Sequence, residues 1–237
     1  MERHDEIIKT AISNYSSSNP WPEQDIWHRY TFAAEKTTVE KWLAGFSSED
    51  TTILNAGSGG TEYNTRGKMI HLDIIEKYIC RFDYYLVGSI EKINLPNASV
   101  DGVICVGSVL NYADAQRSIS EFSRILKPGG FLILEFERSD SAEFLWTEQH
   151  GKYIFSKKYD YNGQSHLLWM YSEKHIRQML KHYDLHIIKC KRIHSMSSLL
   201  YRLGLSEKVA APYSKLDSVL QPLSYPLAHN VMLLCTK

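Results

Sequence analysis

Short apolar runs, separated by polar or glycine-rich turns, recur through the first 137 residues of the chain. They cover residues 51–56, 69–73, 84–87, 103–106 and 131–137. Continuous apolar runs of this length are typical of strands that are buried on both faces of a parallel sheet. Between the last two runs, Ile119, Phe122 and Ile125 recur at helical spacing after Asp114, a residue type that caps helices. This alternation predicts an α/β domain with a mainly parallel sheet.

The N-terminal 46 residues have a helical pattern instead. Residues 7–12 predict a short helix, and the polar residues at 14–20 predict a loop. Residues 25–46 carry apolar and aromatic side chains at helical spacing, which predicts a longer helix. We therefore separate residues 1–46 from a domain at 47–237.

The C-terminal hundred residues are less regular. Residues 138–170 are aromatic without a clear period, and residues 192–228 contain several prolines. We interpret both as cap or insertion segments. Between them, residues 172–182 predict a helix that begins at a serine cap, and residues 186–190 and 230–235 predict two strands. These two strands are candidates for an antiparallel addition to the sheet.

Composition narrows the possible partners and the compartment. The 27 basic and 27 acidic residues balance, which argues against a nucleic-acid substrate, and no apolar run is long enough to span a bilayer. The N-terminus lacks the apolar core of a signal peptide, so we expect a cytoplasmic protein with reduced thiols. No metal is expected, because neither the cysteines nor the histidines have the spacing of a metal site. The residues in question are Cys80, Cys105, Cys190, Cys235, His166, His175, His182 and His186.

The glycine cluster after the first strand is the main candidate binding element. Gly57, Ser58 and Gly59 allow the backbone to approach a ligand closely. The third glycine of a dinucleotide fingerprint is replaced by Glu62, whose charge would repel a pyrophosphate, so a ligand with a positive centre is favoured. At the end of the second strand, Asp73 is placed to accept hydrogen bonds from a ribose diol. An ordinary turn and a helix cap are the alternative interpretations of these two features.

Longer motifs give a more specific indication. The segments ILNAGSGGTEY, MIHLDI, VGSIEKINLPNASVDGVICVGSVLNY and SEFSRILKPGGFLILEFE follow one another between residues 53 and 137. Their order resembles that of the class I S-adenosylmethionine-dependent methyltransferase family. The resemblance implies a Rossmann-like seven-stranded sheet with the order 3-2-1-4-5-7-6, an antiparallel strand 7, helices on both faces and an N-terminal helical lid. It also implies S-adenosylmethionine as the cofactor.

The resemblance assigns roles to individual residues. Gly57, Ser58 and Gly59 would lie against the methionine part of the cofactor, and Asp73 would hold the ribose hydroxyls. Further cofactor contacts are expected from Asn55, Ser89, Ile90, Val106 and Gly107. Tyr30, on the N-terminal helix, is a candidate for the cofactor carboxylate. Candidates for a general base are His28, Glu137, His150 and His194, and of these we select His28 and Glu137.

Three features depart from the family pattern. Asn55 and Ser89 stand where the family usually has acids, and little chain separates the first two strands. The expected function is transfer of a methyl group to an oxygen or nitrogen atom of a small molecule, in an assembly of unspecified size. The alternatives are a catalytically silent, methyltransferase-like binding or partner subunit and, with less support, an NAD-dependent oxidoreductase.

Overall fold

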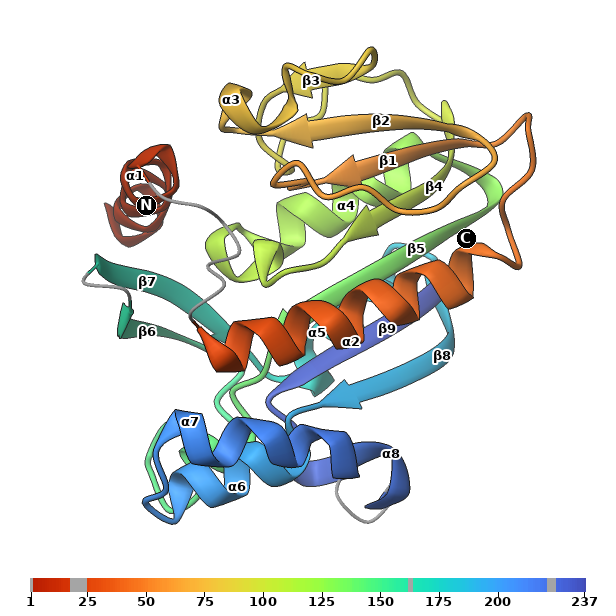
Figure 1. The fold of residues 1–237 in the computed structure, drawn as a ribbon. Coiled ribbons are helices and arrows are strands. Elements are labelled where there is room, and N and C mark those ends of the chain that lie inside the picture. Colours follow the sequence, from red (N-terminus) through yellow and green to blue (C-terminus); the bar gives the residue numbers. More distant parts are fainter. Residues whose placement is uncertain (1, 18–24, 162–163, 221–224) are drawn as a thin grey trace.

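A seven-stranded sheet forms the centre of the computed structural model, which describes residues 2–17, 25–161, 164–220 and 225–237 (Figure 1). Its strand order is β3-β2-β1-β4-β5-β9-β8. The first five strands pair in parallel, whereas β9 is antiparallel to both β5 and β8. When β8 and β9 are counted as the sixth and seventh strands of this sheet, the order is 3-2-1-4-5-7-6, which confirms the predicted fold class. The strands are β1 (Thr52–Ala56), β2 (Lys68–Asp73), β3 (Tyr85–Val87), β4 (Val100–Cys105), β5 (Leu126–Glu137), β8 (His186–Ile193) and β9 (Asn230–Thr236).

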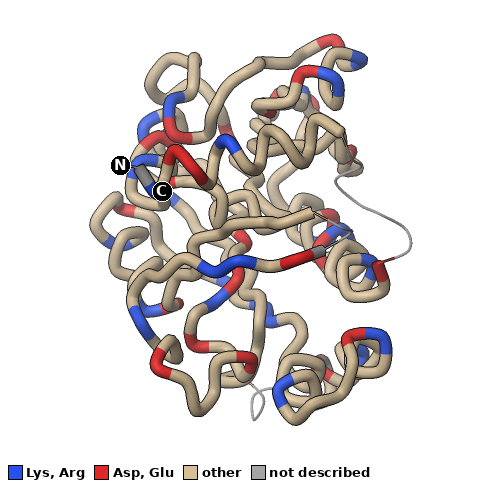
Figure 2. Tube along the Cα trace, turned by 90° about the vertical axis from the view of Figure 1, so that its left-hand side faces the viewer, with Lys and Arg blue, Asp and Glu red and all other residues tan. Residues whose placement is uncertain are grey.

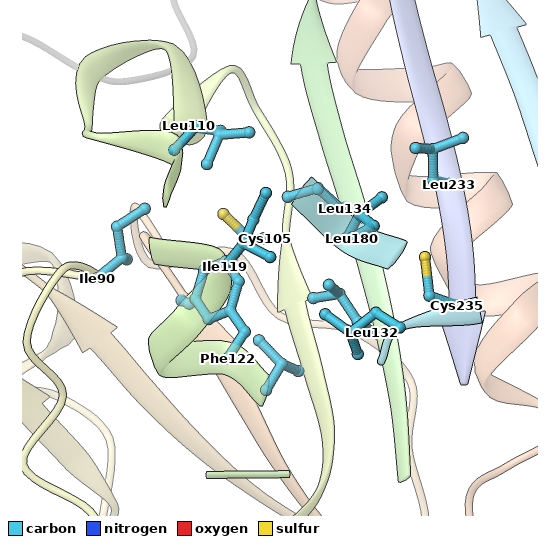
Figure 3. Packing of buried hydrophobic residues seen from close by; sticks show 14 of the residues in the cluster. Ile90, Cys105, Leu110, Ile119, Phe122, Leu132, Leu134, Leu180, Leu233 and Cys235 are labelled. Atoms are coloured by element: carbon cyan, nitrogen blue, oxygen red, sulfur yellow. The ribbon is translucent and has the colours of Figure 1, made fainter. Parts of the chain in front are cut away.

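Helices α4 (Ala115–Ile125) and α5 (Glu173–His182) cover one face of the sheet. Each begins at the predicted cap, because the side chains of Asp114 and Ser172 accept hydrogen bonds from the first backbone N–H groups of the two helices. The apolar faces of both helices pack on side chains from β4, β5 and β9. Figure 3 shows Phe122 of α4 and Leu180 of α5 among strand residues such as Leu132. This contact buries the larger part of the core.

Helix α2 (Ile26–Leu43) runs across the opposite face. Its C-terminal half carries Val39, Trp42 and Leu43, which pack on side chains of β1, β4 and β5 such as Ile53 and Ile133. This anchoring fixes the N-terminal end of α2 beside the end of the sheet where β1, β2 and β4 finish (Figure 1). Helix α1 (Glu2–Ser17) lies beyond that same end.

Three sequence-based expectations about elements were wrong. The polar residues 14–17 belong to α1 and not to a loop; residues 18–20 lie outside the described part of the chain. Residues 138–170 are not wholly irregular, because β6 (Ile154–Tyr161) pairs with β7 (Gln164–Tyr171) as a two-stranded antiparallel sheet. Strand β5 begins at Leu126, before the Pro128-Gly129-Gly130 segment, because Gly129 and Gly130 exchange backbone hydrogen bonds with Lys237.

Short helices complete the chain. The link between β1 and β2, residues 57–67, contains no helix, as the small number of residues had predicted. Helix α3 follows β2. The chain between β8 and β9 forms a group of short helices, which lies below the sheet in Figure 1. These elements are α3 (Glu76–Ile79), η1 (Val109–Tyr112), η2 (Ala142–Phe144), α6 (Ser195–Arg202), α7 (Glu207–Ala210), η3 (Ala211–Leu216), α8 (Asp217–Leu220) and η4 (Tyr225–Leu227).

Charges of both signs are interspersed along the chain (Figure 2). In the described ranges, no helix combines the length and the apolarity that crossing a membrane requires. Within those same ranges, no group of histidine, cysteine or acidic side chains is arranged to hold a metal ion.

Candidate functional site

The glycine loop after β1 is held in one conformation by its own backbone. Gly57 and Ser58 donate N–H groups to the carbonyl of Leu72 on the neighbouring strand, at 2.8 and 3.0 Å. Gly57 has φ +70°, and a Cβ there would lie 2.3 Å from a methyl group of Val109. The side chain of Asn55 donates to the carbonyl of Thr61 at 2.8 Å. Asn55 therefore holds the loop in place by donating a hydrogen bond, which an ionised acid at this position could not do.

Asp73 connects this loop to the end of β2. One carboxylate oxygen accepts the N–H of Gly59 at 2.7 Å, and the other accepts the N–H of Ile75 at 2.8 Å. Burial raises the pKa of Asp73, although these N–H groups act in the opposite direction. Each oxygen keeps a further lone pair, so the carboxylate can accept two more hydrogen bonds from a diol.

Ser58 has a structural partner beneath the loop. Its hydroxyl lies 2.7 Å from Nδ1 of His71, whose ring stacks on Phe82 at a centroid distance of 3.6 Å. Burial lowers the pKa of His71 to about 4, so the imidazole is neutral at pH 7. The hydroxyl of Ser58 is therefore directed to β2, and its backbone is the part available to a ligand.

The segment after β3 provides a second acidic group. Ser89 and the buried Ile90 line the cavity described below, as does Glu91. The hydroxyl of Ser89 accepts the N–H of Glu91 at 3.1 Å. The Glu91 carboxylate accepts the N–H of Asp114 at 3.1 Å and lies 3.0 Å from Nε2 of His4 in α1. The acid that is missing at position 89 thus has a counterpart two residues later, which the sequence analysis overlooked.

The loop after β4 is supported by a buried carboxyl pair. Gly107 and Ser108 both have positive φ, +82° and +57°. The N–H of Ser108 donates to Glu135 at 2.6 Å, and Glu35 of α2 lies close enough for the two carboxyl groups to interact. Burial raises the pKa of Glu135 to about 7 and that of Glu35 well above its ordinary value. These two acids lie under the loop that contains Val106 and Gly107.

Opposite the glycine loop, one imidazole lies between two carboxylates. Nε2 of His229 is 3.4 Å from Glu137, and Nδ1 is 3.2 Å from Glu143. Burial alone would lower the pKa of His229, but the hydrogen bond and charge of Glu137, together with Glu143, raise it. Burial acts against Glu137 as well, yet His229 and the hydroxyl of Ser108 lower its pKa overall. Glu137 and His229 therefore form a buried pair in which each group favours the charged form of the other.

The N-terminal turn of α2 faces the same space. Trp27, His28 and Thr31 line it, and Nδ1 of His28 lies 3.1 Å from Asp25, the cap of the helix. Tyr30 does not join them, because it lies about 200° around the helix from His28. It faces Lys215, whose ammonium is 5.5 Å from the ring centroid. The expectation that Tyr30 contacts the cofactor is therefore wrong for this arrangement.

Two other histidine candidates lie elsewhere. His194 is fully buried and stacks on Trp27 at 4.1 Å, with Nε2 2.9 Å from the hydroxyl of Thr31. Burial lowers its pKa well below the ordinary value, so it is a neutral structural group. His150 is exposed and does not line the cavity.

These elements enclose one cavity of about 610 Å³ at the end of the sheet. Helix α1 contributes Ile8, Ala11 and Tyr15 to its wall. Such a position, at the carboxyl ends of parallel strands, is where open α/β sheets bind ligands. Of the predicted site residues, the structure brings together at this cavity Asn55, Gly57, Ser58, Gly59, Asp73, Ser89, Ile90, Val106, Gly107, His28 and Glu137.

The polar groups of the cavity fit S-adenosylmethionine better than a dinucleotide. Lys208 is the one lysine or arginine that lines it within the described ranges, so a pyrophosphate would lack counter-charges. Carboxylates are frequent in the lining, as a sulfonium and an ammonium group require. They are Asp25, Asp73, Glu91, Glu137, Glu143, Asp160 and Glu207.

Comparisons with known proteins agree with this geometry. A family model described as a methyltransferase domain matches residues 57–134. A comparison with curated proteins finds no match. Among solved structures, the 1,6-didemethyltoxoflavin-N1-methyltransferase of Burkholderia thailandensis, with bound 1,6-didemethyltoxoflavin and S-adenosylhomocysteine, is similar at a TM-score of 0.61 and 13% identity, over 98% of this chain and 89% of that one.

Two further solved structures share the fold. The [4+2]-cyclase SpnF has a TM-score of 0.55 at 12% identity, over 100% of this chain and 93% of that one. The geranyl diphosphate C-methyltransferase of Streptomyces coelicolor A3(2) has a TM-score of 0.54 at 13% identity, over 88% of this chain and 77% of that one. The family model, the strand order and the cavity agree with the motifs found in the sequence: residues 57–134 match a methyltransferase domain, the whole chain has the fold of S-adenosylmethionine-dependent methyltransferases, and S-adenosylmethionine is the cofactor that this match indicates.

Proposed function

We propose that this chain transfers a methyl group from S-adenosylmethionine to an oxygen or nitrogen atom of a small molecule. The observation that carries the proposal is the shared cavity. The glycine loop and Asp73 line it, and so do the ionisable groups Glu137, His229 and Glu143. A cavity of about 610 Å³ lies in the size range of small-molecule sites.

On the cofactor side, each group has a task that its geometry supports. S-adenosylmethionine, when bound, supplies a methyl group activated by a sulfonium. Asp73 accepts the ribose hydroxyls with its remaining lone pairs, and Gly57 and Gly59 let the backbone approach the methionine portion. Ser89 and Ile90 would lie at the adenine. Val106 and Gly107 would flank the cofactor, while Asn55 and Ser58 hold the loop in position through Thr61 and His71.

On the acceptor side, His28 is our candidate for the general base. Its imidazole lines the cavity, and Asp25 at 3.1 Å orients it. Glu137 was expected to be a general base. Its carboxylate accepts a hydrogen bond from Ser108 and pairs with His229, so we assign it an electrostatic role in the cavity and not the acceptance of a proton. Alignment of the acceptor with the methyl group accounts for most of the expected rate, up to about 7–11 kcal/mol in favourable cases.

The structural neighbours differ in the atom that they modify, as their names state for nitrogen and for carbon. We prefer oxygen or nitrogen because O–H and N–H groups donate hydrogen bonds, and side chains that can accept them line the cavity. We place the protein in the cytoplasm, in accordance with its four free cysteines.

Calorimetry with S-adenosylhomocysteine tests the cofactor site. We expect Asp73→Ala to weaken binding by at least about tenfold, since a charged hydrogen-bond acceptor is worth roughly 1.5–3 kcal/mol. Asp83→Ala is the matched control, because Asp83 is an exposed aspartate outside the cavity. An unchanged affinity in Asp73→Ala, or no binding to the wild type, would contradict the proposal.

A catalytically silent binding or partner subunit is the second candidate. The observation that favours it is the absence of a helix in residues 57–67, so that no helix N-terminus faces the cofactor in this loop. It predicts that the purified protein is free of cofactor and forms no methylated product from any small molecule in an acceptor panel.

A further inference from the structure

Part of the cavity lining carries more acidic than basic side chains. We call it the acceptor half and define it by Glu137, Glu143, Tyr159, Tyr201, Glu207 and His229. The carboxylate of Glu143 accepts the hydroxyl of Tyr159 at 3.0 Å and lies 3.2 Å from His229. Glu137 lies 3.4 Å from the same imidazole. One imidazole thus serves two glutamates, and at most one of the two negative charges is balanced by it.

Among the described residues, two of these carboxyl groups lack a counter-charge sufficient to favour their ionised form, which a bound cation would supply. Burial raises the pKa of Glu143, and the charge of Glu137 raises it further. Burial, followed by the charge of Asp25, raises the pKa of Glu207. Lys208 also lines the cavity, but one ammonium does not offset these carboxylates.

Aromatic rings form the walls around these acids. Trp27 lies edge-to-face with His229 at 6.0 Å and with Tyr201 at 6.2 Å between ring centroids. Tyr159 lines the cavity beside them. Aromatic faces with nearby carboxylates attract organic cations by cation–π and charge interactions together, and they disfavour anions.

The side-chain oxygen of Asn230 is a separate observation that indicates a hydrogen-bond donor in the ligand. Asn230 lines the cavity and is only 2% exposed. Its Nδ2 donates to Glu135 at 2.8 Å, but within the described ranges its Oδ1 has no hydrogen-bond partner. An acceptor oxygen of this kind is costly to bury unless a ligand or water donates to it.

Building on the proposed methyl transfer, we propose that the acceptor is a small molecule with a protonated amine, which the acceptor half binds as an ammonium ion through Glu137 and Glu143. The ammonium donates to these carboxylates and to Asn230, while its apolar body lies against the aromatic rings. A carboxylate or phosphate in the same place would be repelled.

The proton and the electron pairs of methyl transfer to an amine can all be accounted for at this site. For an amine acceptor the base is Glu143 in place of His28: the ammonium R–NH3⁺ gives one proton to Glu143, which leaves the neutral amine R–NH2. The nitrogen lone pair then forms the new N–C bond while the C–S bond of the sulfonium breaks, and the electron pair of that bond stays on sulfur in the thioether. The product leaves as R–NH2–CH3⁺, and Glu143 returns its proton to water.

Three probes with one skeleton and three charges test this inference: 2-phenylethylamine, 2-phenylethanol and 3-phenylpropionate. Each is titrated calorimetrically, at up to millimolar concentration, into the full-length protein saturated with S-adenosylhomocysteine. We expect the amine to bind at least about tenfold more tightly than the alcohol, and the carboxylate to bind most weakly. Equal affinities, a preference for the alcohol or carboxylate, or no binding of the amine would overturn the inference.

Two variants and a control locate the effect. Glu143→Gln should reduce the preference for the amine over the alcohol by about tenfold, and the more exposed Glu207→Gln should reduce it by a smaller factor. Glu148→Gln, an exposed change in the same segment, should leave the preference unaltered. An unaltered preference in both Glu143→Gln and Glu207→Gln would refute the role of these acids. S-adenosylhomocysteine binding is measured first and separately, so a failure of the cofactor site is distinguishable from a failure of the charge preference.

Discussion

Glu35 is a residue whose charge state should control stability. It is 1% exposed, and its pKa is raised well above 4.5 by burial and then by the charges of Glu135 and Glu137. The folded protein therefore holds this proton at pH values where the unfolded chain has lost it. The corresponding stability is fully present below about pH 4.5 and is lost as the pH rises through the folded pKa.

Glu35→Gln removes this dependence and keeps the shape of the side chain. Relative to the wild type, we expect its free energy of unfolding to rise between about pH 5 and pH 8, by at most about 1.4 kcal/mol per pH unit. Urea denaturation at several pH values measures the difference, and the exposed Glu49→Gln is the control. A difference that stays constant with pH would show that Glu35 is ionised in the folded protein.

The sequence alone identified residues whose role depends on their immediate neighbours in the chain. Gly57, Gly59 and Asp73 lie directly at strand ends. A tight turn there requires glycine, and a ribose diol requires a hydrogen-bond acceptor such as a carboxylate. His229 and Glu143 were missed because nothing near them in the sequence marks them. They come together because β9 pairs antiparallel to β5 with Asn230 opposite Glu137, and this register brings His229 to the end of β5. The register is set by packing of the whole sheet.

At the scale of elements, the glycine loop and η1 depend on each other. Gly57→Ala would place its Cβ 2.3 Å from a methyl group of Val109 and at a φ of +70°. We expect a loss of about 2–4 kcal/mol, which combines the unfavourable φ with overpacking. Gly151→Ala separates the two causes, since its φ is +73° but nothing lies within 4 Å of the added Cβ.

Urea denaturation of the two glycine variants and of Gly57→Ala combined with Val109→Ala provides the measurement. The combined variant should recover part of the loss, because the smaller side chain makes room for the new methyl group. Equal losses in Gly57→Ala and Gly151→Ala would mean that crowding against η1 contributes nothing.

Helices and strands were predictable from the sequence where apolar residues recur with a clear period, and less so elsewhere. The parallel strands, α4 and α5 were predicted because their apolar runs and caps agree. The hairpin β6–β7 was not predicted, because neither IFSKKYDY nor QSHLLWMY alternates apolar and polar residues regularly. Asn162-Gly163 between the two strands is the signal that would have found it, since this dipeptide favours two-residue hairpin turns.

At the scale of the whole molecule, α1 closes the cavity from outside the sheet. Polar contacts tie it to several distant segments: His4 to Glu91 at 3.0 Å, Asn14 to the carbonyl of Ser165 at 2.8 Å, and Tyr15 to Tyr112 at 3.1 Å. Further hydrogen bonds join α1 to α3 and to the β6–β7 hairpin, and within the described ranges none of these hydrogen bonds and ion pairs to other segments reaches the central sheet. We therefore propose that α1 is the lid part of the N-terminal segment and opens while the sheet remains folded.

Two isoleucine-to-alanine changes on this helix test the lid. Ile7 is fully buried, whereas Ile12 is 41% exposed. Truncating the buried side chain removes packing worth roughly 2–5 kcal/mol, and this loss destabilises the closed position of α1 relative to the open one. We expect Ile7→Ala to accelerate dissociation of S-adenosylhomocysteine by at least about tenfold in stopped-flow displacement, and to speed amide exchange in α1 but not in β4 or β5. Ile12→Ala should dissociate at the wild-type rate. If Ile7→Ala instead lowers protection throughout the sheet, α1 is an integral part of the fold; if both variants release the ligand at the wild-type rate, the ligand leaves by a path that α1 does not cover.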